Sequence, residues 1–315
     1  MKDFLKSTLL IGNGLNRCLE NSISWSDLLK DVSSDYDVEY NGAIPMPLEF
    51  ESIVNQILKK SKNPSNKLYE EIKEKIAQKV IHTKLPENSI HYRIKDISIN
   101  SVLTTNYDNL LEYVFDFEYK FKGENRKKYL FNPVSVQKGI SFYHIHGHAE
   151  NPKSICLGYE HYMGIVEHLR KEINTKENGS EEKMKIYMAL KESKLLNDNW
   201  YEKFYTDNIY IVGLGLSESE VDLWWLLTHR AYLFYSDFHG IKENLINKII
   251  YYDIVDESKK DECVQKDKIH YMLSKLNVNV KKYILNKDCN NYLDGYNKIF
   301  DEIHEENNHV RTDLR

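Results

Sequence analysis

Short runs of apolar and β-branched residues alternate with segments of helical periodicity along this chain, and this alternation limits the possible folds. Six runs have the length and composition of buried strands. They are residues 7–12, 97–105, 141–146, 208–215, 247–253 and 277–285. Helical patterns lie between them, clearest over 25–32, 107–115, 218–233 and 265–276. Strands that alternate with helices favour a mostly parallel sheet covered on both faces, so we predict a doubly wound α/β fold.

Two stretches are too long to be simple connections between neighbouring strands. About 85 residues separate the first two predicted strands, about 60 separate the third from the fourth, and helical periodicity dominates both stretches. We therefore expect a single domain over 1–315 with a Rossmann-like core and an inserted helical module over the mouth of the sheet. The core takes in about 5–36, 97–159 and 205–290, and the module about 37–96 and 160–204. The polar tail after Ile303 is expected to fray.

Charge and cysteine content argue against several classes of function. The formal net charge is -5, whereas nucleic-acid binding needs a basic surface. The basic stretch 120–128 is interrupted by Gly123 and Glu124, as in a solvated loop. The four cysteines form no Cys-x-x-Cys pair, so a zinc ribbon is not expected. No apolar run reaches the ~20 residues of a membrane span and no secretion signal is recognisable, which predicts a cytoplasmic protein.

A glycine-rich loop, Gly12-Asn13-Gly14-Leu15-Asn16, follows the first predicted strand. Open α/β sheets bind ligands at the carboxyl ends of their strands, where a glycine turn lets backbone amides approach a pyrophosphate. The dinucleotide fingerprint G-x-G-x-x-G is incomplete, because Arg17 stands at its third glycine. The acidic residue expected about 20 positions later is not evident either. On this loop alone, a tight turn and a nucleotide-binding loop are equally good interpretations.

Polar side chains also end the second and third predicted strands. Thr105, Asn106 and Asp108 follow the second strand, and His144 and His146 end the third. Asn and Asp at such positions often cap the next helix. A histidine there can be a hydrogen-bonded core residue, a metal ligand or an acid–base group. The two histidines share one face of a strand, as metal ligands would, but no carboxylate stands at a matching spacing, so no metal is expected.

Six short motifs occur in order along most of the chain. They are G-N-G-L-N (12–16), I-S-W-S-D-L-L (23–29), T-T-N-Y-D (104–108), H-I-H-G (144–147), S-I-C-L-G-Y-E-H-Y (154–162) and G-L-G-L-S-E-S-E-V-D (213–222). The first stands where sirtuins carry G-A-G-x-S, the third resembles their Q-N-x-D motif, and the fourth resembles the motif of their catalytic histidine. Together the six resemble the sirtuin-like superfamily, specifically its bacterial NAD-hydrolysing branch in antiphage defence.

The resemblance implies an NAD+ glycohydrolase that cleaves its substrate NAD+ to nicotinamide and ADP-ribose. It implies that Asn106 holds a ribose hydroxyl and orients water, and that His146 is the general base. The implied NAD+ contacts are Gly12, Asn13, Gly14, Asn16, Thr105, Asp108, Gly213, Ser217 and Asp222. Gly12 and Gly14 would cradle the pyrophosphate, and Ser217 would meet the adenosine ribose. Such enzymes deplete NAD+ in abortive infection, so a homo-oligomer and an activating protein partner or phage component are further expectations.

Two departures from protein-deacylating sirtuins bear on the reaction. The four-cysteine zinc module and the G-I-P-D-F-R loop of those enzymes are both absent, which favours hydrolysis of NAD+ itself. An NAD-dependent protein deacylase remains one alternative, and a non-catalytic subunit that binds NAD+ or ADP-ribose remains another. Release of nicotinamide without an acyl-lysine substrate would exclude the deacylase. Tight binding of NAD+ without turnover would identify the regulatory subunit.

Overall fold

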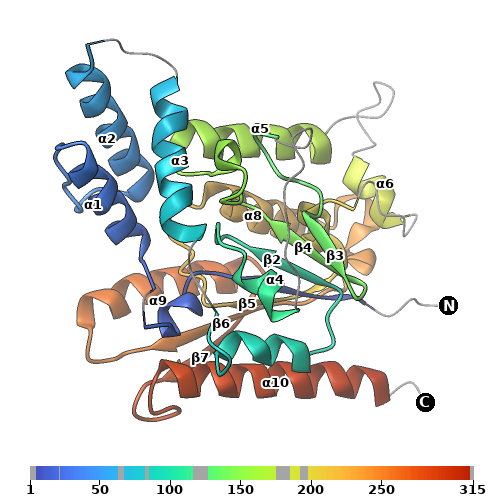
Figure 1. Cartoon of the computed structure of the whole chain (residues 1–315). Helices are drawn as coiled ribbons and strands as arrows, with labels where there is room; N and C mark the ends of the chain where they lie inside the picture. Colours follow the sequence, from blue (N-terminus) through green and yellow to red (C-terminus); the bar gives the residue numbers. More distant parts are fainter. Residues whose placement is uncertain are drawn as a thin grey trace.

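A seven-stranded sheet forms the centre of the molecule (Figure 1). The computed structural model describes residues 5–20, 22–62, 67–81, 85–115, 127–174, 185–191 and 198–312. The strands are β1 (Ser7–Ile11), β2 (Ser101–Thr104), β3 (Ser135–Gln137), β4 (Ile140–His144), β5 (Asn208–Val212), β6 (Ile249–Val255) and β7 (Asn279–Ile284). Their order is β3-β4-β2-β1-β5-β6-β7, and all neighbours are parallel except β3 and β4.

The order of the parallel strands is that of a Rossmann-like sheet. Numbered along the chain without β3, it reads 3-2-1-4-5-6, which is the doubly wound order of dinucleotide-binding folds. Leu9 of β1 lies opposite Val102 of β2 on one side and opposite Tyr210 of β5 on the other. The winding therefore reverses between β1 and β5, and the loops after these strands flank the crevice where such sheets bind ligands. This confirms the predicted fold class.

Helices cover both faces of the sheet, as Figure 1 shows with α5 and α8 above it and α10 below it. The upper layer contains α5 (Tyr159–Asn174), α6 (Lys185–Lys191), α7 (Lys203–Thr206), α8 (Val221–Ser236) and α9 (Lys260–Lys275). The lower layer contains the 3₁₀ helix η2 (Ile90–Asp96), α4 (Leu110–Val114) and α10 (Tyr292–Thr312). Leu10 faces the upper layer and Leu9 the lower, so burial on both faces explains the continuous apolar strands.

Three further helices have a core of their own beside the strand ends. They are α1 (Trp25–Asp35), α2 (Met46–Lys60) and α3 (Lys67–Ile81). This core closes against Tyr107 and Ile155, which lie in the loops after β2 and β4. A capping box between Ser24 and Asp27 begins α1 and places Trp25 at its first position. Because α5 and α6 pack on the sheet instead, the two inserted stretches do not share one core, and the boundaries of a helical module stay a proposal.

The chain end differs from the expected frayed tail, because α10 continues to Thr312. Asn307 is buried, and its Oδ1 accepts hydrogen bonds from Ser7 Oγ (2.9 Å) and Tyr210 Oη (3.0 Å). These bonds attach the polar end of the helix to β1 and β5. None of the helices described is both long enough and apolar enough to cross a membrane. Most of the predicted solvated loop at 120–128 lies outside the described residues.

Candidate functional site

The glycine loop after β1 lies directly against the loop after β5. Gly12 N donates to Val212 O (3.0 Å), and Gly14 N donates to Gly213 O (2.8 Å). A Cβ on Gly12 would come within 2.5 Å of Gly213 O, so a side chain there would force the two backbones apart. The following η1 (Asn16–Cys18) is a single 3₁₀ turn, too short to add the amide end of a long helix. The glycines thus permit the loops to meet at the switch point, and their amides are already hydrogen-bonded.

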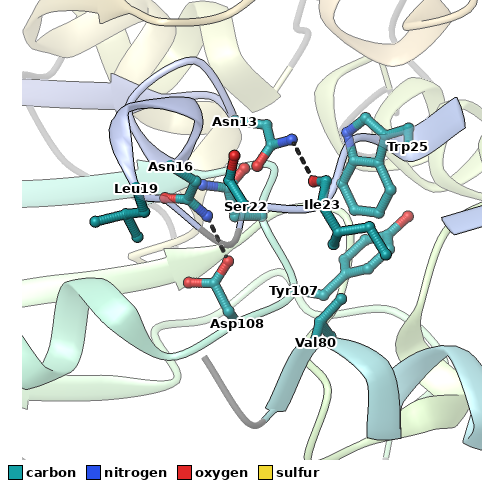
Figure 2. A pocket seen from close by; sticks show the side chains of 10 residues that line it. Asn13, Asn16, Leu19, Ser22, Ile23, Trp25, Val80, Tyr107 and Asp108 are labelled. Atoms are coloured by element: carbon teal, nitrogen blue, oxygen red, sulfur yellow. Dashed lines mark hydrogen bonds between the residues drawn. The ribbon is translucent and has the colours of Figure 1, made fainter. Parts of the chain in front are cut away.

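Asn16 is buried and connects three segments around the glycine loop. Its Nδ2 donates to Asp108 Oδ2 (2.7 Å; Figure 2), and its Oδ1 lies 2.9 Å from His91 Nε2 in η2. Asp108 Oδ1 also accepts from Leu110 N (3.0 Å), so Asp108 caps α4, as one interpretation of the sequence predicts. Burial raises the pKa of Asp108 and lowers the pKa of His91 to about 4. The network therefore holds the loops after β1 and β2 in a fixed relation.

Asn106 lines a cavity beside the glycine loop, which we name the Asn106 cavity. Figure 2 shows this cavity from close by. It encloses about 400 Å³, part of it open to solvent. The other lining residues are Asn13, Asn16, Leu19, Ser22, Ile23, Trp25, Val80, Tyr107 and Asp108. Asn106 Nδ2 lies 3.4 Å from Gly12 O, whereas its buried Oδ1 has no hydrogen-bond partner in the described part of the chain. Since an unpaired buried amide oxygen is costly, this atom indicates a site that accepts a polar ligand.

His146 lines a second cavity of about 540 Å³, again partly open, which we name the His146 cavity. The other lining residues are Trp25, Leu29, Met46, Pro47, Thr105, Tyr107, Cys156, Leu157, Tyr162, Ser217, Ser219 and Glu220. His146 Nε2 donates to Asp222 Oδ2 (3.0 Å), and both side chains are buried. Burial lowers the pKa of His146, but the charge and hydrogen bond of Asp222 outweigh it and leave the pKa raised. Asp222 thus orients the imidazole and leaves Nδ1 for other contacts.

Trp25 and Tyr107 line both cavities. Their ring centroids lie 4.4 Å apart with planes tilted by 59°, and Figure 2 shows the rings side by side at the edge of the Asn106 cavity. Tyr107 is fixed, because its hydroxyl donates to Cys156 O and its carbonyl accepts from Ala149 N. Trp25 is only half-buried. The two predicted catalytic residues therefore do not share one cavity in this structure.

A buried group of Glu112, His144 and His148 has donor atoms within 4.8 Å of one another, a spacing that a metal ion could bridge. The hydrogen bonds favour another interpretation. His144 Nδ1 donates to Asn106 O (2.9 Å), and its Nε2 lies 2.8 Å from Glu112 Oε1. Both ring nitrogens of His144 thus lie against acceptor oxygens rather than at a shared metal position. Burial lowers the pKa of His144, but the charge of Glu112 outweighs it and leaves the pKa raised. The pair supports the Asn106 backbone.

The residues predicted to contact NAD+ fall into four places. Asn13, Asn16 and Asp108 line the Asn106 cavity, and Thr105 and Ser217 line the His146 cavity. Gly12, Gly14 and Gly213 line neither, because they form the contact between the two loops. Asp222 lies behind His146 rather than at either cavity wall.

Tyr107, Tyr162 and Glu220 are among the cavity residues that carry no predicted role. All three occur within motifs quoted above, yet a single sequence offers no sign that their side chains line a cavity. The sharpest available signal is the acidic pair of Glu220 and Asp222, two residues apart before an apolar helix. Two carboxyl groups so close together are a reasonable acid–base candidate in themselves.

Comparison with known proteins supports the resemblance in its general form. A family model of the SIR2-like domain matches residues 100–225, which include Asn106, His146 and Asp222 but not the glycine loop. No curated protein matches the chain. SIR2-like domains are typically NAD-dependent enzymes, and the match covers the loops after β2, β4 and β5 where both cavities meet. The central part of the chain is therefore similar to SIR2-like domains, which supports a sirtuin-like, NAD-related protein.

Proposed function

We propose that the protein is an NAD+ glycohydrolase that releases nicotinamide and ADP-ribose. The observation that carries the proposal is the His146–Asp222 pair, an oriented base near Asn106 at the strand ends of a Rossmann-like sheet. The unpaired Oδ1 of Asn106 supports it, because a ribose hydroxyl is a donor of the kind this atom lacks. The SIR2-like match supports NAD+ as the substrate. The four cysteines are widely spaced and form no Cys-x-x-Cys pair, so they do not match a four-cysteine zinc module, which favours hydrolysis over deacylation.

The proposed reaction needs no general acid. The nicotinamide ring of NAD+ is cationic and leaves as a neutral molecule, so no proton has to be delivered to it. Asn106 holds a ribose hydroxyl and orients the attacking water. His146 Nδ1 takes a proton from that water while Asp222 holds Nε2. General-base catalysis of this kind raises the rate of the chemical step by roughly 10²–10⁴-fold. The water oxygen bonds to the ribose C1′ as the bond to nicotinamide breaks.

NAD+ would have to contact both cavities in this proposal. Asn13, Asn16 and Asp108 offer polar atoms around the Asn106 cavity, and Thr105 and Ser217 do so around the His146 cavity. Gly12 and Gly14 shape the junction at which the pyrophosphate would pass, although their own amides bond to the β5 loop. Joining the cavities requires the half-buried Trp25 to move away from Tyr107.

We also propose that the activity depletes NAD+ in the bacterial cytoplasm during antiphage defence, in an oligomer that a partner protein or phage component activates. The contact between Trp25 and Tyr107 supports a switched enzyme, because both rings line both cavities and a movement of Trp25 would change the space beside each catalytic residue. NAD+ should fall in infected cells that express the wild-type chain. It should stay constant in cells that express Asn106→Ala.

The direct test is incubation of purified protein with NAD+, alone and with phage lysate, while nicotinamide and ADP-ribose are measured. We expect equal release of both products without any acyl-lysine substrate. Asn106→Ala and His146→Ala should abolish release while circular dichroism shows an intact fold. His168→Ala, in a histidine of α5 that lines neither cavity, is the matched control and should stay active.

Three outcomes would contradict the proposal. Full activity of both Asn106→Ala and His146→Ala would show that the catalytic residues are wrong. A requirement for an acylated peptide would identify a deacylase. Tight NAD+ binding without turnover, even with phage lysate, would identify a regulatory subunit.

A further inference from the structure

Glu220 is an acidic residue of the His146 cavity that the proposed reaction does not use. It lies directly before α8, and its side chain makes no capping hydrogen bond to that helix. Only its backbone serves the helix, since its N donates to Ser217 O (3.1 Å) and its O accepts from Trp224 N (3.1 Å). Its Oε2 is buried without a hydrogen-bond partner in the described residues. A backbone hydrogen bond from Ser217 reaches the carboxyl group, so Oε2 is the oxygen that is left without a structural task.

The surroundings of Glu220 are those of an acid–base group. The titratable side chains that face it are His146 after β4, Asp222 in α8, and the phenols of Tyr107, Tyr162 and Tyr251. Burial raises the pKa of Glu220 to about 7; the charge of His146 opposes this effect and that of Asp222 adds to it. A carboxyl group that titrates near neutrality inside a cavity is suited to proton transfer.

Exposure separates Glu220 from the other carboxylate beside His146. Asp222 is fully buried and already bonded to His146 Nε2, so it can hold the imidazole but cannot deliver a proton to water. Glu220 lies two residues before it, lines the same cavity as His146 and is half-buried as a residue. Of the two carboxyl groups, Glu220 is the one that lines a cavity partly open to solvent.

We propose that Glu220 is a second acid–base residue of this site, which receives the proton that His146 takes from the attacking water and releases it to solvent. The inference rests on the proposed hydrolysis of NAD+. Water gives its oxygen to the ribose C1′ and a proton to His146 Nδ1. The electrons of the C1′–nitrogen bond go to the nicotinamide ring and neutralise it. The imidazolium then passes its proton to the Glu220 carboxylate, so one proton leaves per NAD+ cleaved and both residues are restored.

The test compares Glu220→Gln, which keeps the size but cannot take up a proton, with the control Glu218→Gln at an exposed acid two residues earlier. We expect kcat of Glu220→Gln to fall about 10²-fold, with KM within about two-fold and the ionisation near neutral pH lost from the kcat profile. Glu220→Asp should restore part of kcat. Formate should also restore part of the activity of Glu220→Ala, because a small carboxylate can enter the vacated space, but not that of Glu220→Gln.

A second measurement does not depend on turnover. Infrared difference spectroscopy should show a protonated carboxyl band in the wild-type protein that titrates near neutral pH and is missing in Glu220→Gln. Active wild-type protein together with wild-type kcat and pH profile in Glu220→Gln would overturn this inference and leave the proposed function intact. If the wild-type protein does not cleave NAD+, the proposed function fails. The absence of the band would then refute the assignment of Glu220 as the titrating group.

Discussion

A hydrogen bond of 3.0 Å from His146 Nε2 to Asp222 Oδ2 decides which nitrogen of the imidazole is available for chemistry. Asp222→Asn removes the charge that stabilises the imidazolium and allows the wrong tautomer, so kcat should fall by about 10²–10⁴-fold. Because Asp222 helps to hold the pKa of His146 above its ordinary value, the acidic limb of the kcat/KM profile should move to lower pH in the variant. Steady-state rates across the pH range check both effects. An unchanged inflection would show that His146 is not the base.

The residues at the strand ends could be predicted from the sequence, but their partners could not. Asn106 and His146 follow recognisable strands, and parallel strands bring such residues to one edge. Asp222 is 76 positions from His146 along the chain, and their contact depends on how α8 packs beside β4. The sequence therefore predicts Asp222 as an NAD+ contact, whereas the structure shows its carboxylate bonded to His146. Asp222 as an NAD+ contact stays a prediction.

At the scale of elements, the first turn of α1 brings Trp25 against Tyr107 between the two cavities. The interaction of an aromatic pair of this kind contributes about 0.5–1.5 kcal/mol beyond the burial of the two rings. If the pair must part before NAD+ binds, Trp25→Ala should lower KM for NAD+ by about two- to ten-fold with little change in kcat. Trp25→Phe retains a ring and is the matched control. A rise in KM would instead mean that Trp25 itself holds the substrate.

Elements with a regular apolar pattern could be predicted from the sequence. Features that depend on a turn, or on contacts between residues far apart in the chain, could not. All six predicted strands are present within a few residues of their expected ends. The short edge strand β3 was not predicted, because it has three residues and joins β4 through a turn at Lys138 and Gly139. Both have positive φ, +50° and +81°, but Lys-Gly is a weaker hairpin signal than Asn-Gly. The capping box of α1 is a local signal, whereas the contact of Trp25 with Tyr107 is not.

At the scale of the whole molecule, the sheet order explains why distant motifs converge. The switch between β1 and β5 places the loop at 12–16 against the loop at 213–217, while β2 and β4 carry Asn106 and His146 to the same edge. The core of α1, α2 and α3 packs against the loops after β2 and β4. The stability of the site is thus coupled to the folding of the whole chain, and a variant that loosens this core would reduce activity without touching either cavity.

Acid sensitivity of the whole fold follows from histidines that are buried in neutral form. Burial lowers the pKa of His91 to about 4, so between pH 6.5 and that value the unfolded chain binds a proton that the folded chain does not. The free energy of unfolding therefore decreases as pH falls through this window, by about 2 kcal/mol at pH 5 for His91. The raised pKa values of His144 and His146 act in the opposite sense, because their contribution is full below pH 6.5 and is lost as pH rises.

Urea unfolding of His91→Gln tests this prediction. The variant should lose less stability between pH 7 and pH 5 than the wild-type protein, whatever its stability at pH 7. An equally steep slope in His91→Gln would mean that His91 is not held neutral by the fold.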